Sequence, residues 1–208
     1  MSATERVLYI VRHGTTDWNQ LGRIQGHMDI PLNDAGRAQA RLASSRLAPW
    51  GATALYSSDL LRAYETAQII GQSIGLSVVR KPGLREINFG VWQRLSSPQI
   101  RERDPEVYAA RRANPYDIAP AGAETWRQFY DRAVQAIQEI LATTEAQRLI
   151  VVTHSGICTV VGLRALGFDC TGKRTFESHN CGIHTIAVHG ATWRVIALND
   201  VTHLTMTS

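Results

Sequence analysis

The chain has 208 residues, with 22 Lys and Arg against 18 Asp and Glu, and a formal net charge of +4. This length fits one domain with a sizeable core, so we expect a single domain over residues 1–208. The basic residues are dispersed, and Lys81 and Lys173 are the only lysines, which argues against nucleic acid as a partner.

The three cysteines are odd in number and lack the spacing of metal ligands, so we expect reduced thiols in place of disulfides. No charged and apolar leader begins the sequence, and no apolar run approaches membrane-spanning length. These features predict a cytoplasmic protein with no membrane partner.

Strand-like and helical segments alternate along the chain, which is typical of α/β proteins. The apolar run 7–11 predicts a parallel strand that is covered on both faces. A polar loop over 15–31 follows, and Asn33 is the expected cap of the next helix. A second strand over 52–57 leads to a helix that starts near Asp59. These two crossovers predict parallel neighbouring strands.

The middle of the chain is less regular. A short strand over 76–79 and an irregular stretch over 82–92 precede a helix that Ser97 opens, with a proline in its first turn. Further along, Thr125 and Gln128 match a capping box ahead of a helical apolar stripe.

The last third again alternates. The apolar run 149–153 predicts another buried strand, followed by a helix over 156–166. The runs 182–188 and 193–198 flank a glycine like an antiparallel hairpin at a sheet edge. We therefore expect a mostly parallel central sheet with an antiparallel edge.

Two of the predicted strands end at a histidine. His13 follows the first strand, and His154 follows the strand over 149–153. Open parallel sheets bind ligands beyond the carboxyl ends of their strands, so we expect both imidazoles in one crevice. Arg12 adds a permanent charge beside His13, and Gly14 lets a ligand approach the backbone. This arrangement favours attack on an anionic, phosphorylated group.

Arg62 falls in the first turn of the helix that starts near Asp59. A cation there is unfavourable by itself, because the helix dipole is already positive, and an anion bound at that end relieves the cost. The alternative is a surface arginine that pairs with Glu65 or Asp59. Because Arg12 lies at the equivalent end of another strand, we favour a ligand-facing Arg62.

Glu86 is a single carboxylate among apolar residues in the segment 84–90. A carboxylic acid in such surroundings can protonate a departing alkoxide and, in the reverse sense, act as a base toward water. The alternative is an ordinary ion pair with Arg85 or Arg94.

Six ordered segments connect these residues: RHGTTDWN at 12–19, RIQG at 23–26, PLNDAG at 31–36, YSSDLLRAYETA at 56–67, LRE at 84–86 and VTH at 152–154. Together they resemble the histidine phosphatase superfamily, also called the phosphoglycerate mutase-like family. The resemblance extends over nearly the whole chain, and separately constrained motifs agree by chance far less often than a lone tripeptide.

The resemblance implies a three-layer α/β/α sandwich. It implies that His13 is the nucleophile, that Arg12, Arg62 and His154 surround the phosphoryl oxygens, and that Glu86 is the general acid and base. Two guanidinium groups would neutralise the phosphoryl charge without a metal, so we expect no metal and no cofactor. The implied substrate-binding positions are Asn19, Gln25, Gly26 and the backbone of Ser155.

The outer wall of the pocket is less well matched. Ser155 stands where glycine is commoner, and the stretch 121–125 and the pair Gln93–Arg94 also depart from the family pattern. We expect substrate choice to be decided by the segment from Phe89 to Trp126.

The sequence favours a phosphatase that acts on a small phosphorylated metabolite over a mutase. A mutase needs additional cationic anchors and usually carries a histidine-tyrosine-glycine signature where Asn88-Phe89-Gly90 stands. Arg111 and Arg112 resemble the paired arginines of mutases, but they are more simply a solvated helix end.

Two other classes remain. A metal hydrolase with His13, His154 and Glu86 as ligands is disfavoured by the nearby arginines. A non-catalytic binding protein of the same fold is the other. The substrate stays open among sugar phosphates, phosphoglycerates, nucleotides and α-ribazole phosphate, and so does the oligomeric state, with a homodimer as one option.

Overall fold

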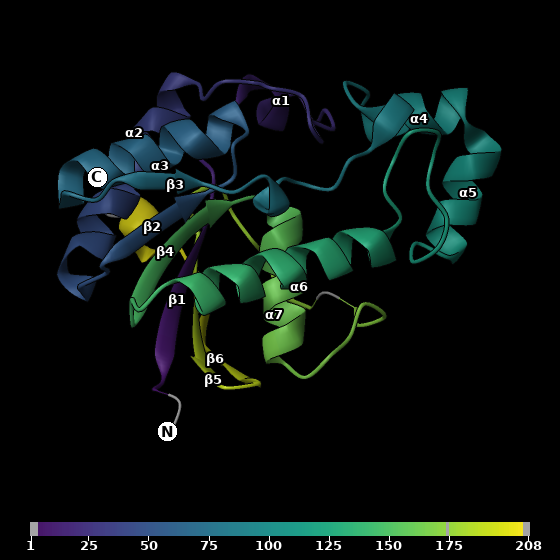
Figure 1. Cartoon of the computed structure of the whole chain (residues 1–208). Helices are drawn as coiled ribbons and strands as arrows, with labels where there is room; N and C mark the ends of the chain where they lie inside the picture. The colour runs from purple at the N-terminus through teal and green to yellow at the C-terminus, as the bar shows by residue number, and fades with distance from the viewer. Residues whose placement is uncertain (1–3, 174, 206–208) are drawn as a thin grey trace.

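The computed structural model describes residues 4–173 and 175–205. Its centre is a six-stranded sheet in the order β3-β2-β4-β1-β5-β6 (Figure 1). The strands are β1 Arg6–Arg12, β2 Ala54–Ser57, β3 Val78–Arg80, β4 Arg148–Thr153, β5 Ile183–His189 and β6 Thr192–Asp200. The first four of that order are parallel, whereas β5 and β6 are antiparallel to their neighbours. The predicted sheet is thus confirmed.

Helices cover both faces of the sheet (Figure 1). One layer contains α2 Asp34–Leu47 and α3 Leu61–Ile74, and the other contains α6 Trp126–Thr143 and α7 Ser155–Ala165. Along β1, Leu8 and Ile10 pack in the core beneath α6 and α7, while Tyr9 and Val11 pack in the core beneath α3. Because a strand alternates its side chains, one continuous apolar run fills both cores. The three-layer sandwich is confirmed.

Side-chain caps start the helices where the sequence predicts. The Asn33 side chain accepts a hydrogen bond from Gly36 N at 2.9 Å, and α2 begins at the next residue. Thr125 and Gln128 form the expected reciprocal capping box at the start of α6. Such caps each stabilise a helix by about 1 kcal/mol.

The order of the strands corrects one prediction. The strands β1 and β2 are not neighbours, because β4 pairs in parallel with both and lies between them. Residues Leu149 to Thr153 are fully buried, which is the environment of a strand in the middle of a covered sheet. The strand β4 therefore lies between β1 and β2, although it follows both in the sequence.

Two segments outside the layers of the sandwich are more helical than predicted. A short helix, α1 Asp17–Gln20, interrupts the polar loop, and the helix opened near Ser97 is two helices, α4 Ser97–Arg103 and α5 Pro105–Ala113. Pro105 causes the break, because proline disfavours a helical conformation in the residue before it. Asp104 accordingly has φ −129° and ψ 57°. Within the described residues, no helix is long and apolar enough to span a membrane.

Candidate active site

The parallel pairing of β1 and β4 brings the two predicted histidines together. Arg12 is in register with Thr153, and the next residue, His13, donates its backbone N–H to Thr153 O at 2.8 Å. The rings of His13 and His154 lie 5.2 Å apart between centroids and are 3% and 0% exposed. The expected meeting of both imidazoles at the carboxyl ends of the strands is therefore found.

His13 is held in one tautomer. Its Nδ1 lies 2.7 Å from Gly14 O, which can only accept, so Nδ1 carries the proton. Its Nε2 then keeps the lone pair and accepts a hydrogen bond from Arg62 Nε at 3.2 Å. Burial, followed by the positive charges of Arg62 and Arg12, holds the pKa of His13 well below its usual value. The ring is neutral at neutral pH.

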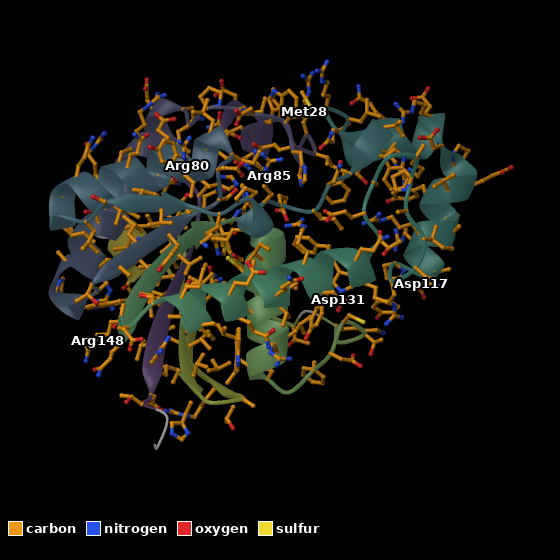
Figure 2. The ribbon with its side chains drawn as sticks, viewed as in Figure 1. Met28, Arg80, Arg85, Asp117, Asp131 and Arg148 are labelled. Atoms are coloured by element: carbon orange, nitrogen blue, oxygen red, sulfur yellow. The ribbon has the colours of Figure 1, made fainter. Side chains whose placement is uncertain are left out.

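Arg62 is buried at the start of α3 and uses each of its nitrogens. Its Nη1 donates to Met28 O at 2.9 Å, its Nη2 to Gly26 O at 2.8 Å, and its Nε to His13. Figure 2 shows Met28 at the end of the molecule where β1, β2 and β4 finish. Burial lowers the pKa of Arg62 to about 10, so the guanidinium remains charged at neutral pH.

The alternative surface pairs for Arg62 are not formed. Glu65 accepts from Arg37 Nε at 2.6 Å, and Asp59 is bonded to both Nε and Nη2 of Arg85 at 2.8 and 2.6 Å. Both carboxylates are thus occupied by other arginines, and Arg62 faces inward to the histidines.

A loop near the carboxyl end of the chain holds Arg12 and His13. Arg12 Nη1 donates to Ser178 O at 2.6 Å, and Asn180 Nδ2 donates to His13 O at 2.9 Å. His184 lies 3.1 Å from the Ser178 hydroxyl through its Nε2. The sequence analysis missed the contacts of Ser178 with Arg12 and of Asn180 with His13, because each joins residues more than 160 positions apart and carries no local motif.

His154 has one ring nitrogen paired and one without a partner among the described residues. Its Nε2 lies 2.8 Å from Ser58 Oγ, which also accepts the N–H of Leu60. When the Ser58 hydroxyl donates to Nε2, the ring proton of neutral His154 lies on Nδ1, which is then an N–H donor. Among the described residues, that buried Nδ1 has no hydrogen-bond partner. An unpaired buried donor costs about 1–3 kcal/mol, and a bound anion would recover this cost.

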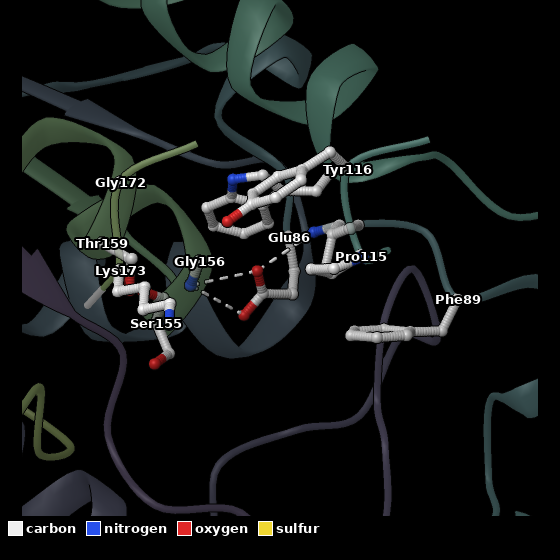
Figure 3. Close-up of a pocket in the computed structure, with 11 residues that line it drawn as sticks. Glu86, Phe89, Pro115, Tyr116, Ser155, Gly156, Thr159, Gly172 and Lys173 are labelled. Carbon is white, nitrogen blue, oxygen red and sulfur yellow. Dashed lines mark hydrogen bonds between the residues drawn. The ribbon is translucent and has the colours of Figure 1, made fainter. Parts of the chain in front are cut away.

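Glu86 meets the first turn of α7. Its Oε1 accepts the N–H groups of Ile87 at 3.0 Å and Gly156 at 3.1 Å, and its Oε2 lies 3.3 Å from Gly156 N (Figure 3). Neither alternative ion pair is formed within the described residues, and Arg85 pairs with Asp59 instead. Glu86 also lines a cavity of about 510 Å³, of which His13 is not a lining residue.

Hydrogen bonds from Arg132 of α6 hold the segment that carries Glu86. Arg132 forms a two-point ion pair with Glu124, and its guanidinium also donates to the carbonyls of Gly83, Arg85 and Glu86 at 2.8 to 3.2 Å. Glu124 in turn accepts the N–H of Asn88 at 2.8 Å. The sequence analysis singled out neither Arg132 nor Glu124, because no sequence pattern indicates their ion pair.

The four implied substrate-binding positions differ in their hydrogen bonds and surroundings. Asn19 Oδ1 caps α1 by accepting from Thr16, and Gly26, at φ +51°, offers its carbonyl to Arg62. Gln25 is buried, and its Oε1 has no partner among the described residues. Ser155 begins α7 and lines the cavity.

The prediction of a solvated Arg111 was wrong. Its guanidinium lies 5.3 Å from the ring centroid of Phe89 and 5.8 Å from that of Trp92, and burial lowers the pKa of Arg111. The folded chain brings these rings against the end of α5, and their faces attract the cation. Arg112 is exposed, as expected.

Within residues 4–173 and 175–205, no group of three or more His, Cys, Asp or Glu side chains is arranged to hold a metal ion. Charge at the site is instead supplied by Arg12 and Arg62, whose fields both act on His13.

Comparison with known proteins extends over the same residues. The sequence model of the histidine phosphatase superfamily (branch 1) matches residues 8–201. Phosphoglycerate mutase-like protein 4 of Arabidopsis thaliana is 37% identical over 201 residues, covering 95% of this chain and 86% of that protein. A metal-independent phosphoserine phosphatase of the same plant is 34% identical over 200 residues, covering 95% and 82%.

A solved structure agrees with these sequence matches. The mycobacterial glucosyl-3-phosphoglycerate phosphatase in complex with VO3 superposes with a TM-score of 0.84 at 30% identity, covering 93% of this chain and 98% of that one. The strand-end histidines, the inward arginine and these matches lead to one conclusion: the chain belongs to the histidine phosphatase superfamily, a family of phosphatases and mutases.

Proposed function

We propose that this protein is a metal-independent phosphomonoesterase that works through a phosphohistidine on His13. The observation that carries the proposal is a buried neutral imidazole whose Nε2 lone pair lies in a field of two guanidinium groups. A neutral ring is nucleophilic, and fixed cations stabilise the charge spread over a phosphoryl group in transfer.

In the first step, His13 Nε2 attacks phosphorus and the bond from phosphorus to the alcohol oxygen breaks. Glu86 donates a proton to the departing oxygen. Arg62 Nε, which now donates to Nε2, turns its N–H to a phosphoryl oxygen, and the unpartnered Nδ1 of His154 donates to another. The Gly14 carbonyl keeps accepting from Nδ1 of His13 and so supports the charge of the phosphorylated ring.

In the second step, the Glu86 carboxylate takes a proton from water as the water oxygen attacks phosphorus. The bond from phosphorus to Nε2 breaks, and inorganic phosphate leaves. Glu86 is held at the first turn of α7, next to His154, where one carboxyl group can serve both proton transfers.

The cavity favours hydrolysis over mutase transfer. A mutase retains a doubly phosphorylated intermediate, which needs several cationic anchors. In the described part of the cavity wall, Lys173 is the only cationic side chain, and Arg111 is packed against aromatic rings. A cytoplasmic location is part of the same proposal.

Phosphate release from p-nitrophenyl phosphate, measured with and without a chelator and vanadate, tests the proposal. We expect activity that resists the chelator and is blocked by vanadate, a mimic of the phosphoryl transition state. Activity lost on chelation would favour a metal hydrolase. A parallel assay with 3-phosphoglycerate separates the classes, because faster transfer than phosphate release would make the protein a mutase.

A further inference from the structure

With Glu86 as the proposed proton donor, the alcohol leaves beside the cavity that Glu86 lines. This cavity has a volume of about 510 Å³, and Figure 3 shows the Glu86 carboxylate inside it, with Tyr116 and Phe89 among the side chains around it. The group next to a general acid is the alcohol part of the ester. The walls of this cavity therefore decide which alcohols fit. Their apolar and aromatic part is formed by Ile87, Phe89, Pro115, Tyr116 and Trp126.

The polar atoms of the cavity walls are largely engaged elsewhere. Tyr116 OH donates to Thr171 O at 2.8 Å, and Trp126 Nε1 donates to Cys170 O at 2.8 Å. The Thr159 hydroxyl donates at 2.9 Å to a backbone carbonyl one turn earlier in α7. These bonds turn the donors of both aromatic rings toward the loop that follows α7. The rings consequently offer carbon surfaces to the cavity.

The remaining aromatic wall is also fixed. Arg111 lies over the ring of Phe89, with 5.3 Å between the guanidinium carbon and the ring centroid. Such a cation stabilises one ring position and leaves the rest of the ring to the cavity. Lys173 lines the cavity but is exposed, so water screens its charge.

We propose, on the basis of the proposed function, that the substrate is a phosphomonoester whose alcohol carries an apolar ring that binds among Phe89, Tyr116 and Trp126. A ring-sized apolar group loses its contact with water there and gains three aromatic surfaces. A sugar or polyol of the same size would exchange water for walls with few free hydrogen-bond partners, so each unsatisfied hydroxyl would weaken its binding.

Three primary alkyl phosphates test this class: 2-phenylethyl phosphate, glucose 6-phosphate and glycerol 3-phosphate. Their leaving oxygens are chemically similar, so differences in kcat/KM report the fit of the alcohol. We expect the phenyl ester to exceed both others by about 10- to 100-fold, the range for enclosing one phenyl-sized apolar group. Glucose 6-phosphate as the best of the three would instead assign the walls to a sugar.

A matched pair of variants locates the preference. Tyr116→Ala removes a wall of the cavity, whereas Tyr116→Phe keeps the ring and removes only the bond to Thr171. We expect the ratio of kcat/KM for the phenyl ester over glycerol 3-phosphate to fall several-fold in the first variant and to persist in the second. Equal ratios in both variants and the wild type would overturn the proposed location.

The inference and the proposed function fail differently. Hydrolysis of all three esters at similar rates overturns the apolar-ring class and leaves the phosphatase intact. If p-nitrophenyl phosphate and all three esters resist hydrolysis, the phosphatase proposal fails, and dissociation constants of the same three esters, measured by calorimetry, decide the cavity alone. Tightest binding of the phenyl ester supports the inference, and equal binding ends it.

Discussion

The base of the site and its outer wall are built by different means. The base consists of His13, Arg62 and His154, which follow strand ends or begin a helix and are nearly completely buried. The wall consists of the segment from Glu86 to Trp126, which is largely loop and short helix and borders an open cavity. In the proposed function, the parallel strands position the groups that act on the phosphoryl group, and the connection after β3 selects the alcohol.

The largest expected effect comes from removing the proposed nucleophile. We expect His13→Ala to lower kcat by about 10,000-fold or more, because the arginines alone cannot form the covalent intermediate. Steady-state assays on p-nitrophenyl phosphate measure this loss, and a thermal melt checks the fold. A folded variant with the wild-type rate would rule out His13.

Glu86→Gln tests the proton transfer that we assign to Glu86, the first residue of the outer wall. For an alkyl ester such as glycerol 3-phosphate, we expect kcat to fall by about 100- to 10,000-fold, because the alkoxide must be protonated as it leaves. For p-nitrophenyl phosphate, whose phenolate leaves without a proton, the loss of the phosphorylation rate should be much smaller. If the single-turnover rate of enzyme phosphorylation falls equally with both esters, the role of Glu86 is contradicted.

Arg132→Met should give a weaker form of the same pattern. Arg132 bonds the carbonyls of Gly83, Arg85 and Glu86, so its loss frees the segment that positions the carboxyl group. We expect about a 10- to 100-fold loss on alkyl esters with a smaller loss on p-nitrophenyl phosphate.

Arg46→Met is a matched control for this variant. Arg46 forms a partly buried ion pair with Asp200, which has no bond to the Glu86 segment in the described residues. Its removal should lower stability without changing the ratio of alkyl to aryl rates. If Arg132→Met also leaves that ratio unchanged, Arg132 only stabilises the fold.

The smallest expected effect concerns the protonation of His13 and His154. Because burial and two arginines hold the pKa of His13 well below 6.5, its ring should stay neutral as the pH falls through 6.5. Burial also keeps the pKa of His154 well below that value. Below pH 6.5 the two histidines therefore bind protons in the unfolded chain but stay neutral in the folded one. The free energy of unfolding should consequently decrease as the pH falls.

NMR signals of the two rings, assigned with histidine variants, check this prediction. The same rings in the urea-unfolded protein provide the reference titration. A folded-state midpoint at or above 6.5 for His13 would contradict the neutral nucleophile.

The base was largely predictable from sequence, and its supports were not. The apolar runs ahead of His13 and His154 predicted both strands, and parallel strand ends at one edge explain why the rings meet. The position of β4 between β1 and β2 was missed, because local periodicity does not fix strand order. The Arg132–Glu124 clamp was missed, because an ion pair that binds three carbonyls has no sequence pattern.

The wall was predicted least well. Arg111 was expected in water because charged residues commonly end helices. What holds it is the pair of rings at Phe89 and Trp92, about 20 residues earlier, which only the tertiary structure brings to α5.

The most direct test is to trap the covalent intermediate. The enzyme is mixed with a phosphomonoester, quenched in base within one turnover and digested, and the phosphorylated residue is identified by mass spectrometry and phosphorus NMR. The account predicts an acid-labile phosphoryl group on Nε2 of His13. A phosphoryl group on another residue, or on Nδ1 of His13, would contradict it.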